Sequence, residues 1–275
     1  MATNCKSGQI LFLRKSYIDL DNKNPIITIT DAVATNTGQD SVTFLRNRNN
    51  ISGWVTTNST DAANTEILVE LFDYFNVDLI ALVKHNFKNY TIEWRNSSAV
   101  WASYDIGSLN TETTNIHEKV TPVLTNAIRI TITGTQIVDA DKELRQLIIT
   151  EKKYKFEGWP VIKKPVHSKN KKNNKMLSGK VNIVDSRGAF SCTLEIKLSG
   201  SENDLTAHEE IYEQAEGLLM LLSGGNEDQF RTKRKGYKNE DFVLVRPVDE
   251  YSNPYDKGVY TMGMKIKMKL AETIF

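Results

Sequence analysis

Residues 66–94 read EILVELFDYFNVDLIALVKHNFKNYTIEW, and this stretch decides the fold class of the chain. It holds three short runs rich in β-branched and aromatic residues, at positions 67–72, 79–84 and 90–94. Apolar residues recur at every second position, as in Tyr90, Ile92 and Trp94, which is typical of strands with one buried face. Three strands in so short a stretch leave no room for crossover helices, so we predict antiparallel pairing in a β-sandwich.

Similar short runs continue on both sides of this stretch, at residues 26–30, 100–104, 127–133 and 144–150. An Asn/Thr/Ser-rich segment at residues 34–64 has the composition of loops, because these side chains hydrogen-bond their own backbone. About eight short strands in the first 150 residues is the density of a sandwich or jelly roll. We therefore predict a mainly β chain whose residues 1–150 form an antiparallel β-sandwich.

The sequence after residue 178 has a different pattern. Residues 180–184 and 189–198 read as a hairpin, and residues 242–245 and 259–270 read as strands. Between them, apolar residues from His208 to Leu222 recur at helical spacing, and Gly224 with Gly225 provides a stop. We predict that residues 179–275 form an α+β module with one amphipathic helix packed on a β-sheet.

A basic segment separates the two parts. Residues 151–180 contain ten lysines and two glutamates, so their formal charge is +8, against −3 for residues 1–150 and −4 for residues 181–275. We interpret residues 151–178 as a linker or as an arm that docks on an acidic partner. A nucleic-acid partner is less favoured, because residues 167–175 contain no aromatic side chain on which a base could stack. The candidate docking residues are Lys163, Lys164, Lys169, Lys171, Lys172, Lys175, Lys265, Lys267 and Lys269.

No pattern in the sequence predicts catalysis, a cofactor or a metal centre. The four histidines are scattered, Gly179-Lys180 lacks the rest of a phosphate-binding loop, and no nucleophile elbow is present. The pairs Asp19/Asp21 and Asp139/Asp141 remain alternatives as calcium ligands, although such pairs are common in turns. We predict a protein that is not an enzyme.

Composition excludes some further classes. No apolar run approaches the roughly 20 residues that a membrane-spanning helix needs. The first residues, MATNCKSGQILFLRKSY, do not read as a secretory signal. Cys5 and Cys192 match no metal or redox motif, and we expect two reduced thiols in a protein made in a cytoplasm rather than a disulfide.

Residues 20–150 resemble the discoidin, or factor V/VIII type C, jelly roll. The order is a loop tryptophan (Trp54), then ILVELF, DLIALVKHN, YTIEW, Val100-Trp101, AIRITITG and LRQLIIT. No pair of cysteines brackets the domain, unlike in extracellular members. The resemblance implies binding of glycans or lipid head groups through loops at one end, and it carries over no specific binding residue.

The C-terminal part is similar to the β-sandwich-plus-helix module of phage tail-tube and distal tail proteins. The segments concerned are GLLMLLSGG, QFRTKRKGYKNEDFVLVRP and GVYTMGMKIKMKLAE. The resemblance implies a virion protein of a phage tail, made in the host cytoplasm, that forms a homo-oligomeric ring and contacts other tail proteins. This structural role is the leading functional hypothesis. The alternative is an adhesin that binds host-surface glycans through the loop aromatics Trp54, Trp101 and Tyr104, although these residues fit positions in the core equally well.

Overall fold

The computed structural model describes residues 10–13, 16–19, 25–31, 42–46, 53–155, 160–175, 181–197, 202–213, 218–222, 242–251 and 265–272. The chain forms two compact units. The sandwich unit consists of the described parts of Leu13–Lys153. The C-terminal unit consists of the described parts of Gly8–Phe12, Tyr154–Leu222 and Phe242–Phe275. Neither unit contains, within these described residues, a helix long and apolar enough to cross a membrane.

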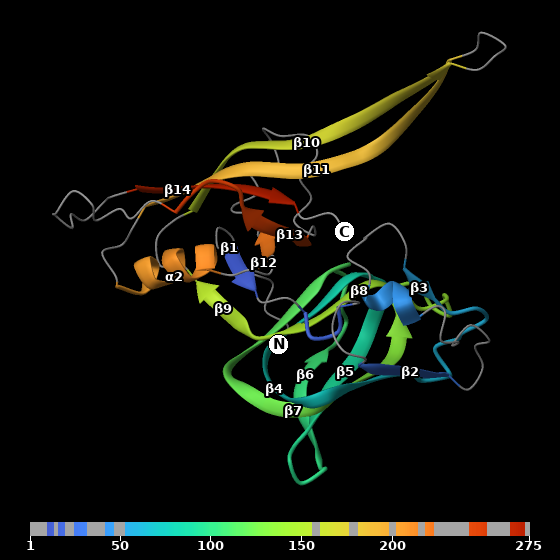
Figure 1. The fold of residues 1–275 in the computed structure, drawn as a ribbon. Coiled ribbons are helices and arrows are strands. Elements are labelled where there is room, and N and C mark those ends of the chain that lie inside the picture. Colours follow the sequence, from blue (N-terminus) through green and yellow to red (C-terminus); the bar gives the residue numbers. More distant parts are fainter. Residues whose placement is uncertain are drawn as a thin grey trace. The chain divides into compact units, whose positions relative to one another are not determined.

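The sandwich unit is built almost entirely from antiparallel strands (Figure 1). Its elements are β2 (Ile26–Asp31), the short 3-10 helix η1 (Thr43–Arg46), β3 (Trp54–Val55), β4 (Thr65–His85), β5 (Phe87–Arg95), β6 (Trp101–Gly107), β7 (Asn115–Thr135) and β8 (Glu143–Thr150). The strands follow the order β3-β8-β4-β7-β5-β6, and β2 pairs with β4. The predicted antiparallel β-sandwich is confirmed.

The first two runs of the opening stretch belong to one strand rather than two. β4 is continuous from Thr65 to His85 and pairs with β7 along much of its length. Residues 73–76, which lie in the break between the first two predicted runs, instead form the bend of the strand. Shifts of register between Glu70 and Phe75 and between Val77 and Leu79 absorb this bend, as β-bulges do.

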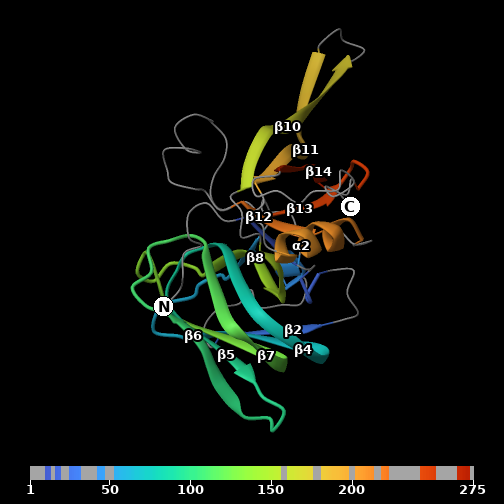
Figure 2. The ribbon, with the colours of Figure 1, turned by 90° about the vertical axis from the view of Figure 1, so that its left-hand side faces the viewer.

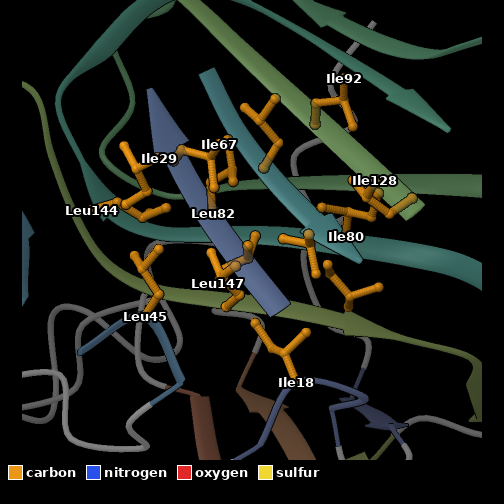
Figure 3. Close-up of a cluster of buried hydrophobic side chains, with 14 of the residues drawn as sticks. Ile18, Ile29, Leu45, Ile67, Ile80, Leu82, Ile92, Ile128, Leu144 and Leu147 are labelled. Carbon is orange, nitrogen blue, oxygen red and sulfur yellow. The ribbon is translucent and has the colours of Figure 1, made fainter. Parts of the chain in front are cut away.

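The bend places β4 and β7 in both layers of the sandwich. The first half of β4 pairs with β2 and with the second half of β7, which continues the layer through β5 to β6. The second half of β4 pairs with β8 and with the first half of β7. The core between the layers contains isoleucine and leucine side chains from both, which point toward one another in Figure 3.

The C-terminal unit combines a seven-stranded sheet with one α-helix among its described residues. Its elements are β1 (Ile10–Leu13), β9 (Lys152–Lys155), β10 (Pro160–Lys175), β11 (Val181–Lys197), α2 (Glu202–Glu213), β12 (Leu218–Leu222), β13 (Phe242–Pro247) and β14 (Lys265–Glu272). The boundaries between the two units fall within β1 and β9. The strand order is β10-β11-β14-β13-β12-β1-β9. Ala207, His208 and Ile211 of α2 are buried, so the predicted α+β module with an amphipathic helix is confirmed.

The predicted helix is too long. α2 ends at Glu213, and the residues Leu218–Leu222 form β12, which pairs with β13. The sequence LLMLL is apolar at every position, so it fits a strand with two covered faces as well as a helix face. Pairing with the backbone of β13 selects the strand over the helix.

The basic segment is part of the sheet. Pro160–Lys175 forms β10, which pairs antiparallel with β11, so the linker interpretation is wrong for these residues. Residues 191–197 of β11 also pair with β14, whereas residues 181–190 pair with β10 alone among the described strands. The hairpin therefore extends beyond the sheet as a two-stranded ribbon, which is visible in Figures 1 and 2. We call its outer half, residues 166–175 and 181–190, the hairpin arm.

Candidate functional site

One layer of the sandwich consists of β2, the first half of β4, the second half of β7, β5 and β6. Its outer face carries a concentrated group of polar and aromatic side chains. Ile67 and Val69 on β4, Ile128 and Ile130 on β7, and Ile92 on β5 are fully buried. Side chains alternate between the two faces of a strand, so their neighbours point outward. The outer face carries Glu66, Glu70, Glu93, Arg95, Trp101 and Arg129, and Asn126 joins it through its hydrogen bond with Arg95; we call this set the Trp101 face.

Arg129 lies at the centre of this face, on β7. Its Nε donates a hydrogen bond to Glu93 Oε2 at 2.8 Å, and its Nη2 lies 2.7 Å from the same oxygen. Its Nη1 is 4.0 Å from Glu66 Oε2 on the opposite neighbouring strand. The guanidinium thus bridges β5 and β4 across its own strand, a cross-strand ion-pair arrangement that stabilises a sheet.

Arg95 forms a second bridge at the end of β5. Its Nε donates to Asn126 Oδ1 at 3.2 Å, and its Nη2 donates to Glu70 Oε1 at 3.4 Å. Trp101 on β6 pairs with Arg95 in the strand register. A row of side chains therefore runs from Trp101 on the edge strand to Glu70 on β4.

The indole of Trp101 is half-buried and contacts both arginines. The guanidinium carbon of Arg129 lies 4.4 Å from the ring centroid, and that of Arg95 lies 5.8 Å from it. Both distances are within the range of cation–π contacts. The two arginines thereby hold an aromatic ring on a polar, partly solvent-exposed face.

The other two aromatic residues predicted as ligand contacts lie in the interior. Trp54 has no exposed surface and is part of the core cluster. Tyr104 is 5% exposed, and its hydroxyl has no hydrogen-bond partner. Burial raises the pKa of the Tyr104 hydroxyl, and the carboxylates of Asp78 and Asp105 raise it further. Neither ring offers a face to a ligand arriving from solvent, so of the three predicted aromatics only Trp101 does.

Sequence reasoning missed the charged members of the Trp101 face and two exposed aromatic residues. Phe72 and Tyr74, on the bend of β4, are 59% and 40% exposed. The alternation of apolar and polar residues along each strand indicates most of these outward positions. Since Ile128, Ile130 and Ile132 face the core, Arg129 must face outward, and Glu93 follows from its buried neighbour Ile92 in the same way.

A buried hydrogen-bond network lies under the edge formed by β5 and β6. His117 has no exposed surface; its Nδ1 lies 2.8 Å from Asp105 Oδ2, and its Nε2 lies 3.1 Å from the Tyr90 hydroxyl. A proton on Nδ1 lets His117 donate to the carboxylate and accept from Tyr90. Burial raises the pKa of Asp105, but the hydrogen bonds from His117 and from the Ile106 N–H outweigh it, and the pKa stays below its usual range.

His85 extends this network on β4. Its Nδ1 accepts the Phe87 N–H at 3.0 Å, so its Nε2 carries the proton and donates to Asn115 Oδ1 at 2.7 Å. Burial lowers the pKa of His85 to about 4. The histidine is therefore neutral near pH 7, and its two hydrogen bonds tie β4 to the starts of β5 and β7.

The candidate calcium ligands Asp139 and Asp141 accept hydrogen bonds from the protein. Asp139 Oδ1 accepts the Asp61 N–H at 3.0 Å, and Asp141 Oδ1 accepts the Ser59 N–H at 3.0 Å. These contacts fix two loops against each other. Among the described residues no group of three His, Cys, Asp or Glu side chains is arranged to hold a metal ion. Asp21 lies outside the described residues.

The predicted docking lysines fall on two strands. Lys267 and Lys269 of β14 are exposed, while Ile266, Met268 and Leu270 are buried, so lysine and apolar side chains alternate between the two faces of this strand. Lys267 Nζ lies 3.6 Å from Glu195 Oε1 on β11. Lys265 is the first residue of β14, and the remaining six lysines, Lys163, Lys164, Lys169, Lys171, Lys172 and Lys175, are positions of β10. Their role in docking stays a prediction.

No family model matches the sequence, and no curated protein matches it. Solved structures do resemble about half of the chain. Chitosan-binding module 1 of a Paenibacillus sp. IK-5 chitosanase/glucanase has a TM-score of 0.41 and 13% identity, covering 50% of this chain and 98% of the module. A family 32 carbohydrate-binding module from Clostridium perfringens NanJ, solved with galactose, has a TM-score of 0.39 and 16% identity, covering 52% of this chain and 99% of the module.

The family 32 module of Streptococcus pneumoniae EndoD has a TM-score of 0.38 and 12% identity, and it covers 46% of this chain and 97% of the module. These neighbours are named as carbohydrate-binding modules. At such identities and TM-scores below 0.5, the description of the fold rests on the strands of the chain itself.

Proposed function

We propose that the sandwich unit binds carbohydrate through the Trp101 face. The observation that carries this proposal is the half-buried indole of Trp101, which two guanidinium groups hold among three carboxylates and an amide. Binding sites for polar ligands combine an apolar contact surface with a few fixed polar groups. An indole beside carboxylate, amide and guanidinium groups matches the alternation of C–H and hydroxyl groups on a sugar ring.

A sheet face that only met solvent would have a different composition. Charged side chains alone keep such a face soluble, whereas an indole left partly exposed forgoes the free energy of burial. On the Trp101 face the ring lies beside an ion-pair network that links β4, β5 and β7. The exposed part of the ring is the surface that would stack on a ligand.

Replacing the indole tests the proposal. The full chain is screened on an array of neutral, amino and acidic oligosaccharides, and the strongest ligand is titrated by calorimetry. Trp101→Ala is expected to weaken binding at least about tenfold, since an aromatic contact contributes about 0.5–1.5 kcal/mol beyond its buried area. Trp101→Phe keeps a ring and should retain part of the affinity.

Tyr74→Ala is the matched control, because Tyr74 is an exposed aromatic residue of the same unit outside the Trp101 face. It should leave the affinity unchanged, and circular dichroism should show that all variants are folded. A silent array, or equal losses for Tyr74→Ala and Trp101→Ala, would contradict the proposal.

A second candidate function is assembly through the hairpin arm, which would fit a homo-oligomeric ring in a phage tail with other tail proteins as neighbours. The arm pairs with no other described strand, and its residues 166–175 and 181–190 contain four lysines and Arg187 against Asp185. α2 of the same unit contains five acidic residues and no basic one, and Glu209 and Glu213 are exposed. An arm of one copy and a helix of the next are therefore complementary in charge.

Reversing charge on the arm tests assembly. The wild-type chain is expected to form oligomers in native mass spectrometry at low ionic strength, and the double variant Lys169→Glu, Lys171→Glu is expected to shift them toward monomer. These two lysines are positions of β10 that pair with Arg187 and Asp185 of β11. The control Lys84→Glu, Lys88→Glu makes the same charge change in the sandwich unit. A wild-type chain that is monomeric at every concentration argues against this function.

A further inference from the structure

We infer that the Trp101 face selects its ligand by charge, binding amino sugars with a free ammonium group more tightly than neutral sugars and acidic sugars least. This inference rests on the proposed carbohydrate binding and adds the chemical class of the ligand. Its basis is the imbalance between carboxylates and guanidinium groups on the face.

Both guanidinium groups are already paired with carboxylates of the sheet. Arg129 has two nitrogens within 2.8 Å of Glu93 Oε2, a charge-assisted contact of short length. Arg95 is shared between Glu70 and Asn126. A carboxylate or sulfate on a ligand would have to displace these intramolecular partners, so the arginines do not form a ready site for an anion.

The carboxylates, by contrast, retain capacity to accept hydrogen bonds. Glu66 and Glu70 contact their arginines at 4.0 and 3.4 Å, longer than the contacts of Glu93, and their side chains are 40% and 38% exposed. An ionised carboxylate accepts several hydrogen bonds and donates none. An ammonium group supplies three donors and a positive charge, and it can approach these two glutamates from solvent.

The summed charge of the face points the same way. Glu66, Glu70 and Glu93 carry three negative charges and Arg95 and Arg129 carry two positive charges, which leaves one negative charge. The electrostatic interactions of such partly exposed groups with a ligand are modest and are screened by salt. The preference for sugars with an ammonium group is therefore expected at low ionic strength. An acidic sugar experiences repulsion on the same surface.

The register sets the length of the ligand. Trp101 lies on the edge strand, and Glu70 lies three strands away across β5 and β7. Neighbouring strands are about 4.8 Å apart, so the row from indole to carboxylate spans roughly 14 Å. A ligand that reaches both ends is an oligosaccharide rather than a single sugar.

Three oligosaccharides of equal length test the inference by calorimetry with the full chain: hexamers of glucosamine, of N-acetylglucosamine and of a uronic acid. At about pH 6 and low salt, where glutamates are ionised, the glucosamine hexamer should bind at least about tenfold more tightly than the acetylated one. The uronate should bind most weakly. The double variant Glu66→Gln, Glu70→Gln should reduce the preference for the glucosamine hexamer to about threefold or less. Its affinity for the acetylated hexamer should be retained.

Glu112→Gln is the matched control, because this glutamate is exposed and lies in a loop outside the face. This variant should leave the order of the three hexamer affinities unchanged. Equal binding of the first two hexamers, or an unchanged preference in the double variant, overturns the inference and leaves carbohydrate binding in place. Failure of all three hexamers and of the neutral sugars on the array overturns both.

Discussion

Lys142 is a charged side chain with no exposed surface. Its Nζ donates hydrogen bonds to Ser59 Oγ at 2.6 Å and to the carbonyl oxygens of Thr60 and Ala63 at 2.9 Å each. Asp31 Oδ2 lies 3.7 Å away and supplies the opposite charge. The ammonium thus gathers the loop at residues 59–63 around itself, because a buried charge without partners would cost several kcal/mol.

Replacing this lysine should therefore destabilise the sandwich unit. Lys142→Met keeps the length of the side chain but removes the positive charge beside the Asp31 carboxylate and the donor to Ser59 Oγ and to the two carbonyl groups. We expect a loss of about 3–5 kcal/mol in the free energy of unfolding, measured by urea denaturation. Arg145→Met, which removes a partly exposed cation 3.9 Å from Glu143, should cost about 1 kcal/mol or less. Similar losses for the two variants would show that the enclosed ammonium is not a structural centre.

At the scale of elements, the pairing of β5 with β6 depends on a glycine. Gly107 pairs with Tyr90 in the register, and a Cβ at Gly107 would lie 2.2–2.8 Å from three ring carbons of Tyr90. The ring cannot move aside easily, because its hydroxyl is hydrogen-bonded to His117 and the ring makes T-shaped contacts with His85 and Phe87. The glycine permits close contact between strand and ring.

Gly107→Ala should therefore destabilise the sandwich unit by about 1–3 kcal/mol, the usual cost of overpacking. Gly134→Ala is the matched control, because its Cβ would meet only Asn89 Nδ2 at 3.2 Å, the end of a side chain that can shift. Thermal unfolding measures both. If both variants have the melting temperature of the wild type, the tight contact at Tyr90 does not constrain the edge strand.

The elements also show where local sequence suffices. Strands with strict alternation, such as the Ile128, Ile130, Ile132 run, are found where alternation predicts them. The run LLMLL and the bend at residues 73–76 were assigned wrongly, because their local patterns fit two structures equally well. In each case a distant strand provides the backbone partners that decide, β13 for the first and β7 for the second.

At the scale of the whole molecule, each unit contains a buried histidine that burial keeps neutral. The pKa of His85 in the sandwich unit is lowered to about 4, and so is that of His208 in the C-terminal unit. An unfolded histidine has a pKa near 6.5. Between these values the unfolded chain binds more protons than the folded chain, so the stability present above pH 6.5 is lost as the pH falls toward 4.

We expect both units to lose stability over this interval, by at most about 3 kcal/mol for each histidine. His85→Gln should weaken the pH dependence in the sandwich unit alone, and His208→Gln should weaken it in the C-terminal unit alone. Hydrogen exchange between about pH 7 and pH 4, followed in peptides from β4 and β5 and from α2 and β13, distinguishes the units. A single substitution that changes both units equally would mean that they unfold as one.

The sequence by itself determined the mainly β class, the antiparallel pairing and the inward faces of the strands, because each depends on the local alternation of apolar residues. It also gave Trp101 as a candidate ligand contact, but it could not separate Trp101 from Trp54 and Tyr104. Only the tertiary structure decided that β4 is one bent strand, that the lysine-rich segment is a strand, and that Glu93, Arg95 and Arg129 surround Trp101. These features depend on which distant strands become neighbours, and no local pattern of residues specifies that.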